Sequence, residues 1–168
     1  MKTVTAVVIS ALAGALVGSL PVGAQRLSAD RESVLTAEVK GAFDQYTESF
    51  SAGRQDLVAQ RSYRAPVLFL RPTGLEVDPT AEAVKARFEG MFKALSADGY
   101  ARSEVSNLHI SIFSEYAASV SGRFVRYRKD GSAIAEFGAT LVLAKTSGGW
   151  RIVSMISHDP SKAFGLSK

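Results

Sequence analysis

The sequence predicts an α+β fold in which N-terminal helices pack on a strongly curved antiparallel sheet. Apolar residues recur in three- and four-residue steps over 35–50 and again over 84–95, which is the spacing of amphipathic helices. After Tyr100 the chain instead reads as strand-like runs separated by hairpin turns. Helices that precede an uninterrupted series of strands are typical of a sheet covered by helices on one face.

The first predicted helix starts at Val34 and ends near 51–53, where Gly53 suits the left-handed conformation common after a helix end. Its apolar face comprises Leu35, Val39, Ala42, Phe43, Tyr46 and Phe50. A shorter helix is predicted around 55–61. Together these helices supply the layer that covers the sheet.

A strand is predicted over 63–70, followed by a turn at 71–74 and a short returning strand at 75–77. Asp78-Pro79 predicts the start of the next helix, because an Asp side chain accepts hydrogen bonds from free backbone N–H groups and Pro is tolerated at the first helical position. The apolar stripe over 84–95 continues that helix as far as Asp98-Gly99.

Four long strands complete the chain. They are predicted at 100–113, 115–128, 133–146 and 149–158. Asp130-Gly131 and the Gly-rich segment 146–149 are hairpin connections, so the strands form an antiparallel meander. Because long strands twist and coil, the sheet is expected to curl and to leave a cavity beneath the helices.

The N-terminus has the pattern of a signal peptide. Met1-Lys2 gives a positive start, 3–20 is apolar, and small residues precede Gln25, so cleavage is expected after Ala24. The alternative is an uncleaved membrane anchor, which needs about 20 apolar residues. The expected organisation is a signal peptide at 1–24, a flexible arm at 25–33, one domain at 34–160 and a flexible tail at 161–168. The expected location is the periplasm or the outside of the cell.

Composition excludes several kinds of site. The chain has no cysteine, so disulfides, a thiolate nucleophile and lipidation at a signal-peptide cysteine are excluded. The net charge of +4 is mild, and the densest basic group, at 123–129, is typical of a solvated strand end, so no nucleic-acid partner is expected. His109 and His158 lie outside any metal-ligand spacing, and no phosphate- or nucleotide-binding motif occurs. We therefore expect no metal, no cofactor and, after cleavage, no membrane partner.

Three motifs carry a resemblance to a known family. They are Phe43-x-x-Tyr46-x-x-x-Phe50-x-x-Gly53, Asp56-Leu57-Val58 leading into Tyr63-Arg64-Ala65-Pro66-Val67-Leu68-Phe69, and Gly148-Gly149-Trp150-Arg151-Ile152-Val153. In this order, and with the helix after Asp78-Pro79, they resemble the nuclear transport factor 2-like superfamily, which includes ketosteroid isomerase and the SnoaL-like polyketide cyclases. The resemblance covers about 34–160. It implies a cystatin-like, cone-shaped α+β barrel with a deep pocket, often a homodimer formed through the sheet, but no single activity.

Aromatic and basic side chains are the candidates for binding a ligand in that pocket. The predicted ligand-binding residues are Tyr46, Tyr63, Phe69, Phe88, Phe92, Arg126, Trp150 and His158. The expected ligand is a small, partly apolar molecule.

His158 and Glu136 are the candidates for acid–base chemistry. His158 shares strand parity with Ile152 and Ile156, which predicts a place at the lip of an apolar wall, where an imidazole can bind a polar group or move a proton. The alternative is a structural histidine bonded to backbone where the sheet ends. His109 is expected to face solvent.

Glu136 lies within the otherwise uncharged run 133–144. A buried carboxylate needs a cation or a raised pKa, and Arg126 on the preceding strand is its expected partner. The alternative is an ordinary exposed cross-strand ion pair.

Three functions fit these observations. The first is an exported domain that binds a small molecule and has no complete catalytic set. The second is an isomerase, cyclase or dehydratase, which requires a glutamate of raised pKa or a Tyr–His pair facing one cavity. The third is a dimerising interaction module, which requires a filled interior and an exposed apolar sheet face.

Overall fold

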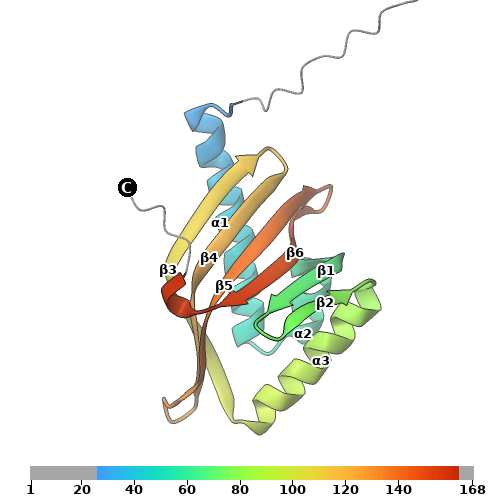
Figure 1. The fold of residues 1–168 in the computed structure, drawn as a ribbon, viewed down its shortest axis with the longest axis vertical. Coiled ribbons are helices and arrows are strands. Elements are labelled where there is room, and N and C mark those ends of the chain that lie inside the picture. Colours follow the sequence, from blue (N-terminus) through green and yellow to red (C-terminus); the bar gives the residue numbers. More distant parts are fainter. Residues whose placement is uncertain (1–25, 163–168) are drawn as a thin grey trace, which may run out of the picture.

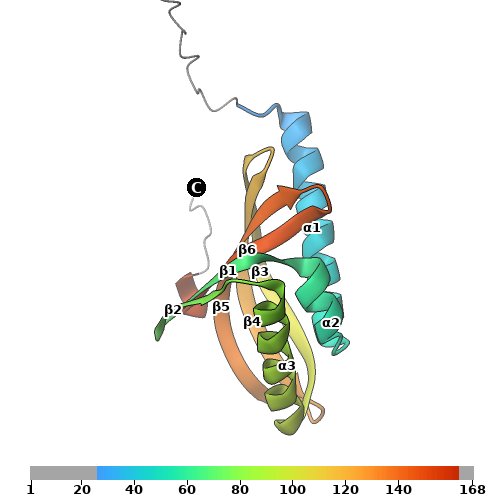
Figure 2. The ribbon, with the colours of Figure 1, turned by 90° about the vertical axis from the view of Figure 1, so that its right-hand side faces the viewer.

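The computed structural model describes residues 26–162, and the predicted signal peptide lies outside them. One six-stranded sheet has the order β2-β1-β6-β5-β4-β3 (Figure 1). All neighbouring strands are antiparallel except β1 and β6, which run parallel. Helices α1, α2 and α3 lie on one side of the sheet, and the short C-terminal turn η2 lies on the other (Figure 2). The predicted α+β architecture is confirmed.

The elements follow one another closely along the chain. The helices are α1 (Ala29–Ser51), α2 (Gln55–Leu57), the π-helical turn η1 (Val58–Ser62), α3 (Ala81–Ala97) and the 3-10 turn η2 (Pro160–Lys162). The strands are β1 (Tyr63–Arg71), β2 (Gly74–Asp78), β3 (Tyr100–Ser114), β4 (Ala117–Arg128), β5 (Ala133–Thr146) and β6 (Gly149–His158). No helix within residues 26–162 is long and apolar enough to cross a membrane.

The start of α1 differs from the prediction. Ser28 caps the helix by accepting a hydrogen bond from the Arg31 backbone N–H at 3.3 Å, so helix begins at Ala29 and not at Val34. The Arg31 side chain then reaches Glu115 in the turn between β3 and β4, with Nε to Oε1 at 2.7 Å. The expected flexible arm over 25–33 is therefore wrong for 29–33. Polar residues continue the helix there because they face outward.

The start of α3 also differs. Thr80 caps the helix, accepting from the Ala83 N–H at 3.2 Å, and the helix begins at Ala81. Asp78, the expected cap, is instead the last residue of β2, and its carboxylate binds Arg87. The prediction of a cap at Asp78 is wrong because a tertiary partner engages that side chain.

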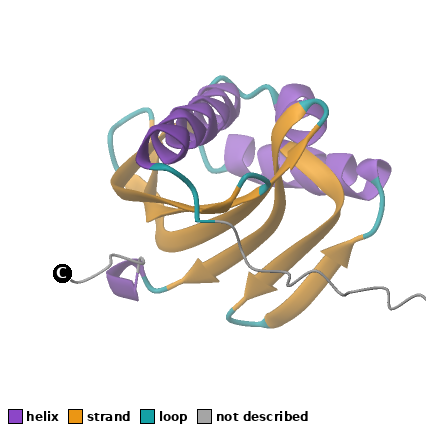
Figure 3. Ribbon diagram, turned by 90° about the horizontal axis from the view of Figure 1, so that it is seen from above, coloured by secondary structure: helices purple, strands orange, loops and turns teal. Residues whose placement is uncertain are grey.

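The sheet is strongly bent, and the helices lie over its concave face (Figure 3). The hydrophobic core lies between them. The buried face of α1 changes character along its length: Leu35 and Val39 are aliphatic, whereas Phe43, Tyr46 and Phe50 are aromatic. The second half of α1 therefore faces a cluster of rings, and that cluster surrounds the site described below.

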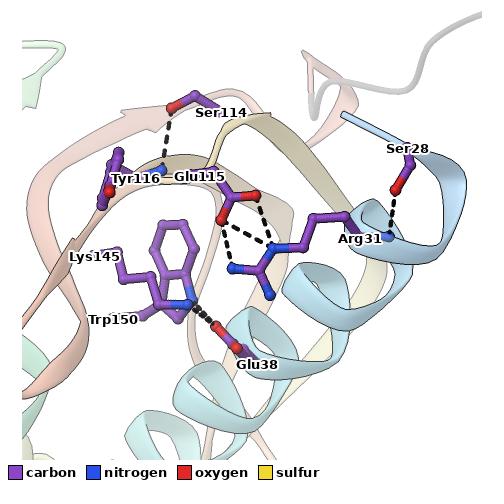
Figure 4. Close-up of polar contacts among 8 residues, drawn as sticks. All are labelled: Ser28, Arg31, Glu38, Ser114, Glu115, Tyr116, Lys145 and Trp150. Carbon is purple, nitrogen blue, oxygen red and sulfur yellow. Dashed lines mark hydrogen bonds and ion pairs between the residues drawn. The ribbon is translucent and has the colours of Figure 1, made fainter. Parts of the chain in front are cut away.

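Three polar contacts fix the first half of α1 to the strand ends (Figure 4). Arg31 binds Glu115, and Glu38 accepts hydrogen bonds from the Trp150 indole N–H at 3.0 Å and from Lys145 Nζ at 2.5 Å. Bonds from Lys145 and then Trp150 lower the pKa of Glu38. These contacts attach the helix to the β3–β4 turn and to β5 and β6.

Because the pKa of Glu38 is lowered on folding, its contribution to stability is present in full above the pKa of an unfolded glutamate, about 4.3. That contribution is lost as the pH falls through the lower pKa of the folded protein. Glu38→Gln is expected to make the melting temperature depend less steeply on pH below about 4.3, as measured by circular dichroism. Glu48→Gln, at an exposed residue of the same helix, should retain the wild-type slope; equal slopes in all three proteins would contradict the assignment.

Candidate functional site

A cavity of about 280 Å³ lies between the second half of α1, α3 and the concave face of the sheet. Its lining residues are Tyr46, Tyr63, Phe69, Arg71, Pro72, Arg87, Phe88, Met91, Arg126, Phe137, Met155, Ser157 and His158. Most of these side chains are aromatic or apolar, with a few polar groups among them. That composition is typical of small-molecule sites.

Six of the eight predicted ligand-binding residues line this cavity: Tyr46, Tyr63, Phe69, Phe88, Arg126 and His158. The structure places the other two elsewhere. The Phe92 ring packs on Phe50 at 4.7 Å beside a separate surface depression. Trp150 is bonded to Glu38 and borders a groove of about 380 Å³ between α1 and β6, whose lining includes the charged side chains of Arg54, Arg61 and Arg151.

Tyr63 lies at the centre of the aromatic wall. Its ring centroid is 4.9 Å from that of Phe88, 6.0 Å from Tyr46 and 6.1 Å from Phe69. Its hydroxyl is buried, and no group within residues 26–162 meets it in good hydrogen-bond geometry. Burial raises the pKa of both Tyr63 and Tyr46 above the usual phenol value. Both phenols are therefore neutral at physiological pH. The Tyr63 hydroxyl interacts with the Tyr46 hydroxyl outside good hydrogen-bond geometry, so its O–H can still turn toward a ligand.

Arg126 reaches the cavity from β4. Its guanidinium carbon lies 5.0 Å from the Phe137 ring centroid and 5.1 Å from that of Phe50, and its Nη2 donates to the Met91 sulfur at 3.7 Å. Burial lowers its pKa, although the group stays charged at neutral pH. Within the described part of the chain, no carboxylate pairs with it.

The predicted pair between Arg126 and Glu136 is wrong. In the β4–β5 register Glu136 lies opposite Val125, while Arg126 lies opposite Ala135, so the two side chains point to opposite faces of the sheet. Glu136 instead accepts from Arg123 Nε at 2.7 Å on the outer face. Arg123 lowers the pKa of Glu136, which is the reverse of what a general acid requires. The alternative, an exposed cross-strand ion pair, describes this residue.

His158 also differs from its predicted place. The register of β5 and β6 shifts between the pairs Leu143–Ile152 and Val142–Ser154, so Ile152 faces the core and Ile156 faces outward. His158 pairs with Gly138, and its imidazole contacts Thr140 Oγ1 through Nε2 at 3.1 Å and the Asp159 carbonyl through Nδ1 at 2.8 Å. The prediction that His158 shares one face of the sheet with both Ile152 and Ile156 is wrong, because Ile152 lies on the opposite face. The structure matches the alternative of a histidine bonded to backbone where the sheet ends.

Replacing Gly138 by alanine is expected to destabilise the protein by about 1–3 kcal/mol, the usual cost of overpacking. An added Cβ would lie 2.3 Å from His158 Nδ1 and 2.8 Å from the Asp159 carbonyl oxygen. Urea unfolding measures the loss, and adding His158→Ala should recover part of it.

Gly90→Ala is the matched control for that substitution. Nothing lies within 4 Å of the added Cβ in α3, and alanine there should stabilise by about 0.5–1 kcal/mol. A Gly138→Ala protein as stable as wild type would contradict the position of the imidazole.

His109 pairs with Ser121 and is exposed on the outer face, as predicted. No cluster of three or more His, Cys, Asp or Glu side chains that could hold a metal ion occurs among the described residues. The polar groups that the structure gathers at the cavity are thus arginine and tyrosine. They bind and orient anions and polar groups. Of the two candidate acid–base side chains, Glu136 is not among the cavity lining, and His158 borders the cavity with both ring nitrogens engaged by Thr140 and the Asp159 carbonyl.

Sequence comparison identifies the family. The profile described as "NTF2-like protein (DUF6841)" matches residues 37–160. The comparison with curated proteins gave no match.

Solved structures share the fold at low identity. An NTF-2 like protein of unknown function from Shewanella oneidensis is 19% identical, with a TM-score of 0.61 over 74% of this chain and 99% of that one. An NTF2-like protein with a cystatin-like fold from Novosphingobium aromaticivorans is 17% identical, with a TM-score of 0.64 over 80% and 88%. An NTF2-like superfamily protein from Salmonella enterica is 18% identical, with a TM-score of 0.56 over 81% and 97%. The family match over most of the chain, together with the bent sheet and its helices, means that this chain belongs to the NTF2-like family.

Proposed function

We propose that this NTF2-like domain binds a small, partly apolar molecule in the cavity between α1, α3 and the sheet. The observation that carries the proposal is an aromatic cavity of about 280 Å³ containing a hydroxyl and a guanidinium without strong partners among the described residues. An engineered apolar cavity of about 150 Å³ binds benzene. A ligand with one or two rings, or an aliphatic molecule of that size, therefore fits.

Binding is favoured over acid–base catalysis by the position of the candidate groups. Glu136 lies on the outer face, and both ring nitrogens of His158 are engaged by Thr140 and the Asp159 carbonyl. Among the described residues that line the cavity there is no Asp or Glu. For an isomerase, cyclase or dehydratase of the predicted kind, the nominated Glu136 is absent from this lining, and the nominated His158 borders the cavity with no free ring nitrogen.

A fragment screen with a blocked variant tests the proposal. Met155 lines the cavity, and Met155→Trp should fill the space. One- and two-ring fragments are expected to bind the wild-type protein, detected by ligand-observed NMR, and to lose that signal with the variant. Fragments that bind both proteins equally, or neither, would contradict a ligand site here. Native mass spectrometry of the protein from its own host tests for a retained ligand.

A homodimer is a second proposal, favoured by an apolar patch on the outer face of the β1–β2 hairpin. Leu68 pairs with Val77 and Leu70 with Leu75, and the four side chains are between 39% and 61% exposed. Neighbouring exposed apolar residues of this kind mark contact sites. Light scattering after size exclusion is expected to give a dimer mass for wild type and a monomer mass for Leu75→Lys with Val77→Lys. A wild-type monomer would contradict the proposal.

Export is proposed on the N-terminal pattern alone: a positive start, an apolar segment and small residues before Gln25. Intact-mass measurement of the protein from the extracytoplasmic fraction of a bacterial host is expected to give a chain that begins at Gln25. Retention of the full-length chain in the cytoplasm would contradict it.

A further inference from the structure

We infer that the ligand carries an anionic group, a carboxylate in chemical class, which Arg126 binds through its guanidinium with the Tyr63 hydroxyl as a second donor. This inference rests on the proposed function, because it names the class of molecule that the same cavity takes. It is carried by two polar side chains of the cavity lining that lack a strong partner: Arg126 contacts only the Met91 sulfur, and the Tyr63 hydroxyl meets that of Tyr46 outside good hydrogen-bond geometry.

Arg126 differs in this respect from the other two arginines at the cavity. Arg87 binds both Asp78 and Glu76, and Arg71 lies 3.3 Å from Glu76. Arg126 has its single hydrogen bond, among the described residues, with the Met91 sulfur, which is a weak acceptor. A partly buried cation without a counter-ion is unfavourable, and a bound carboxylate would offset that cost.

The neighbouring phenols do not supply the missing charge. Tyr46 and Tyr63 are the acidic side chains among the described residues of the cavity lining, and a phenol becomes an anion only when it loses its proton. Burial raises the pKa of each, which opposes that loss. They remain neutral and cannot neutralise the guanidinium. No described group therefore supplies a counter-charge to Arg126, and a carboxylate bound in the cavity is placed to provide it.

The surroundings of Arg126 suit a planar anion. The Phe50 and Phe137 rings hold the guanidinium by cation–π contact, which restricts a long side chain before the ligand arrives. Arginine binds a carboxylate through two parallel N–H donors, and such charge-assisted bonds are about twice as strong as neutral ones. The rest of the cavity wall, including Phe69, Phe88 and Met155, would cover the apolar part of the same molecule.

Acid and amide pairs of equal shape test this inference. Benzoate, phenylacetate and 2-naphthoate are compared with benzamide, phenylacetamide and 2-naphthamide by isothermal titration calorimetry. At least one acid is expected to bind wild type about tenfold or more tightly than its amide, as charged hydrogen bonds predict. In Arg126→Met the preference should disappear while the amide affinity stays within about threefold. Arg123→Met, on the outer face, should keep the full preference.

The outcomes separate the inference from the proposed function. Acids and amides that bind wild type equally would overturn the anionic ligand and leave a binding cavity. Binding of no compound at all would overturn both. A preference that survives in Arg126→Met would overturn the role of Arg126. The wild-type comparison needs no variant, so it decides the ligand class even if Arg126→Met does not fold.

Tyr63→Phe separates binding from packing. The variant removes a buried hydroxyl that has no good partner within residues 26–162, so its melting temperature should equal or exceed that of wild type. If Tyr63 donates to the ligand, acid affinity should nevertheless fall by about threefold or more. Unchanged acid affinity would remove Tyr63 from the site and leave Arg126 as the sole anion-binding group.

Discussion

Replacing Phe88 by alanine is expected to lower the free energy of unfolding by about 3–5 kcal/mol, the usual range for a buried phenylalanine. Phe88 is 2% exposed and packs against Tyr63 with ring centroids 4.9 Å apart. It is the largest fully buried side chain among the described residues and attaches α3 to the sheet. For a domain of this size the melting temperature should fall on the order of 10 °C, which thermal unfolding followed by circular dichroism measures.

Phe113→Ala is the matched control for Phe88→Ala. Phe113 is 64% exposed on β3, so the same chemical change there should alter stability by no more than about 0.5 kcal/mol. Equal losses at the two positions would mean that α3 does not pack on the sheet as described. A loss at Phe88 alone supports the helix–sheet contact that encloses the cavity.

The order and type of the elements could be predicted because their signals are local. The stripe that contains Val84, Phe88 and Leu95 gave α3, and Asp130-Gly131 with the Gly-rich segment 146–149 gave the two hairpins. The predicted strand at 133–146 matches β5 without any shift. These patterns depend on backbone period and turn geometry, which neighbouring residues determine.

The face on which each strand residue lies was harder to predict. Simple alternation placed His158 with Ile152, but the extra residue Val153 between their paired positions reverses the parity. On β3 a similar irregularity occurs near Asn107, which has a φ of 52°, so Val105 packs against the core while His109 is exposed. A β-bulge cannot be located from the alternation of apolar and polar residues, because it depends on how two strands pair in three dimensions.

Six of the eight predicted ligand-binding residues line the cavity, and two do not. Tyr46, Tyr63 and Phe88 were found because the buried face of each element can be read from its period. Phe137 has the same parity as the buried Leu141 on β5 and could have been found by that alternation. Aromatic character alone did not separate the residues at the cavity from Trp150, because both ends of the core contain large side chains.

Arg87→Met is expected to destabilise the protein by about 3 kcal/mol or more, because it leaves Asp78 buried without its counter-ion. Arg87 Nε and Nη2 donate to the two Asp78 carboxylate oxygens at 2.6 and 2.9 Å, and the Asp78 side chain is 9% exposed. Urea unfolding measures the change. Glu76→Gln, which weakens only the 44% exposed partner of Arg87, should cost less than about 1 kcal/mol.

Combining Arg87→Met with Asp78→Leu should be less damaging than Arg87→Met alone, because the double change removes the buried charge together with its partner. Strictly additive losses would contradict a direct coupling between the two groups. The Arg87–Asp78 ion pair therefore positions these elements more than it adds net stability. It joins α3 to β2, and it holds the Arg87 guanidinium carbon 4.2 Å from the Phe69 ring centroid at the cavity. Since Arg87 is neutralised in this way, the charge that remains available to a ligand is that of Arg126.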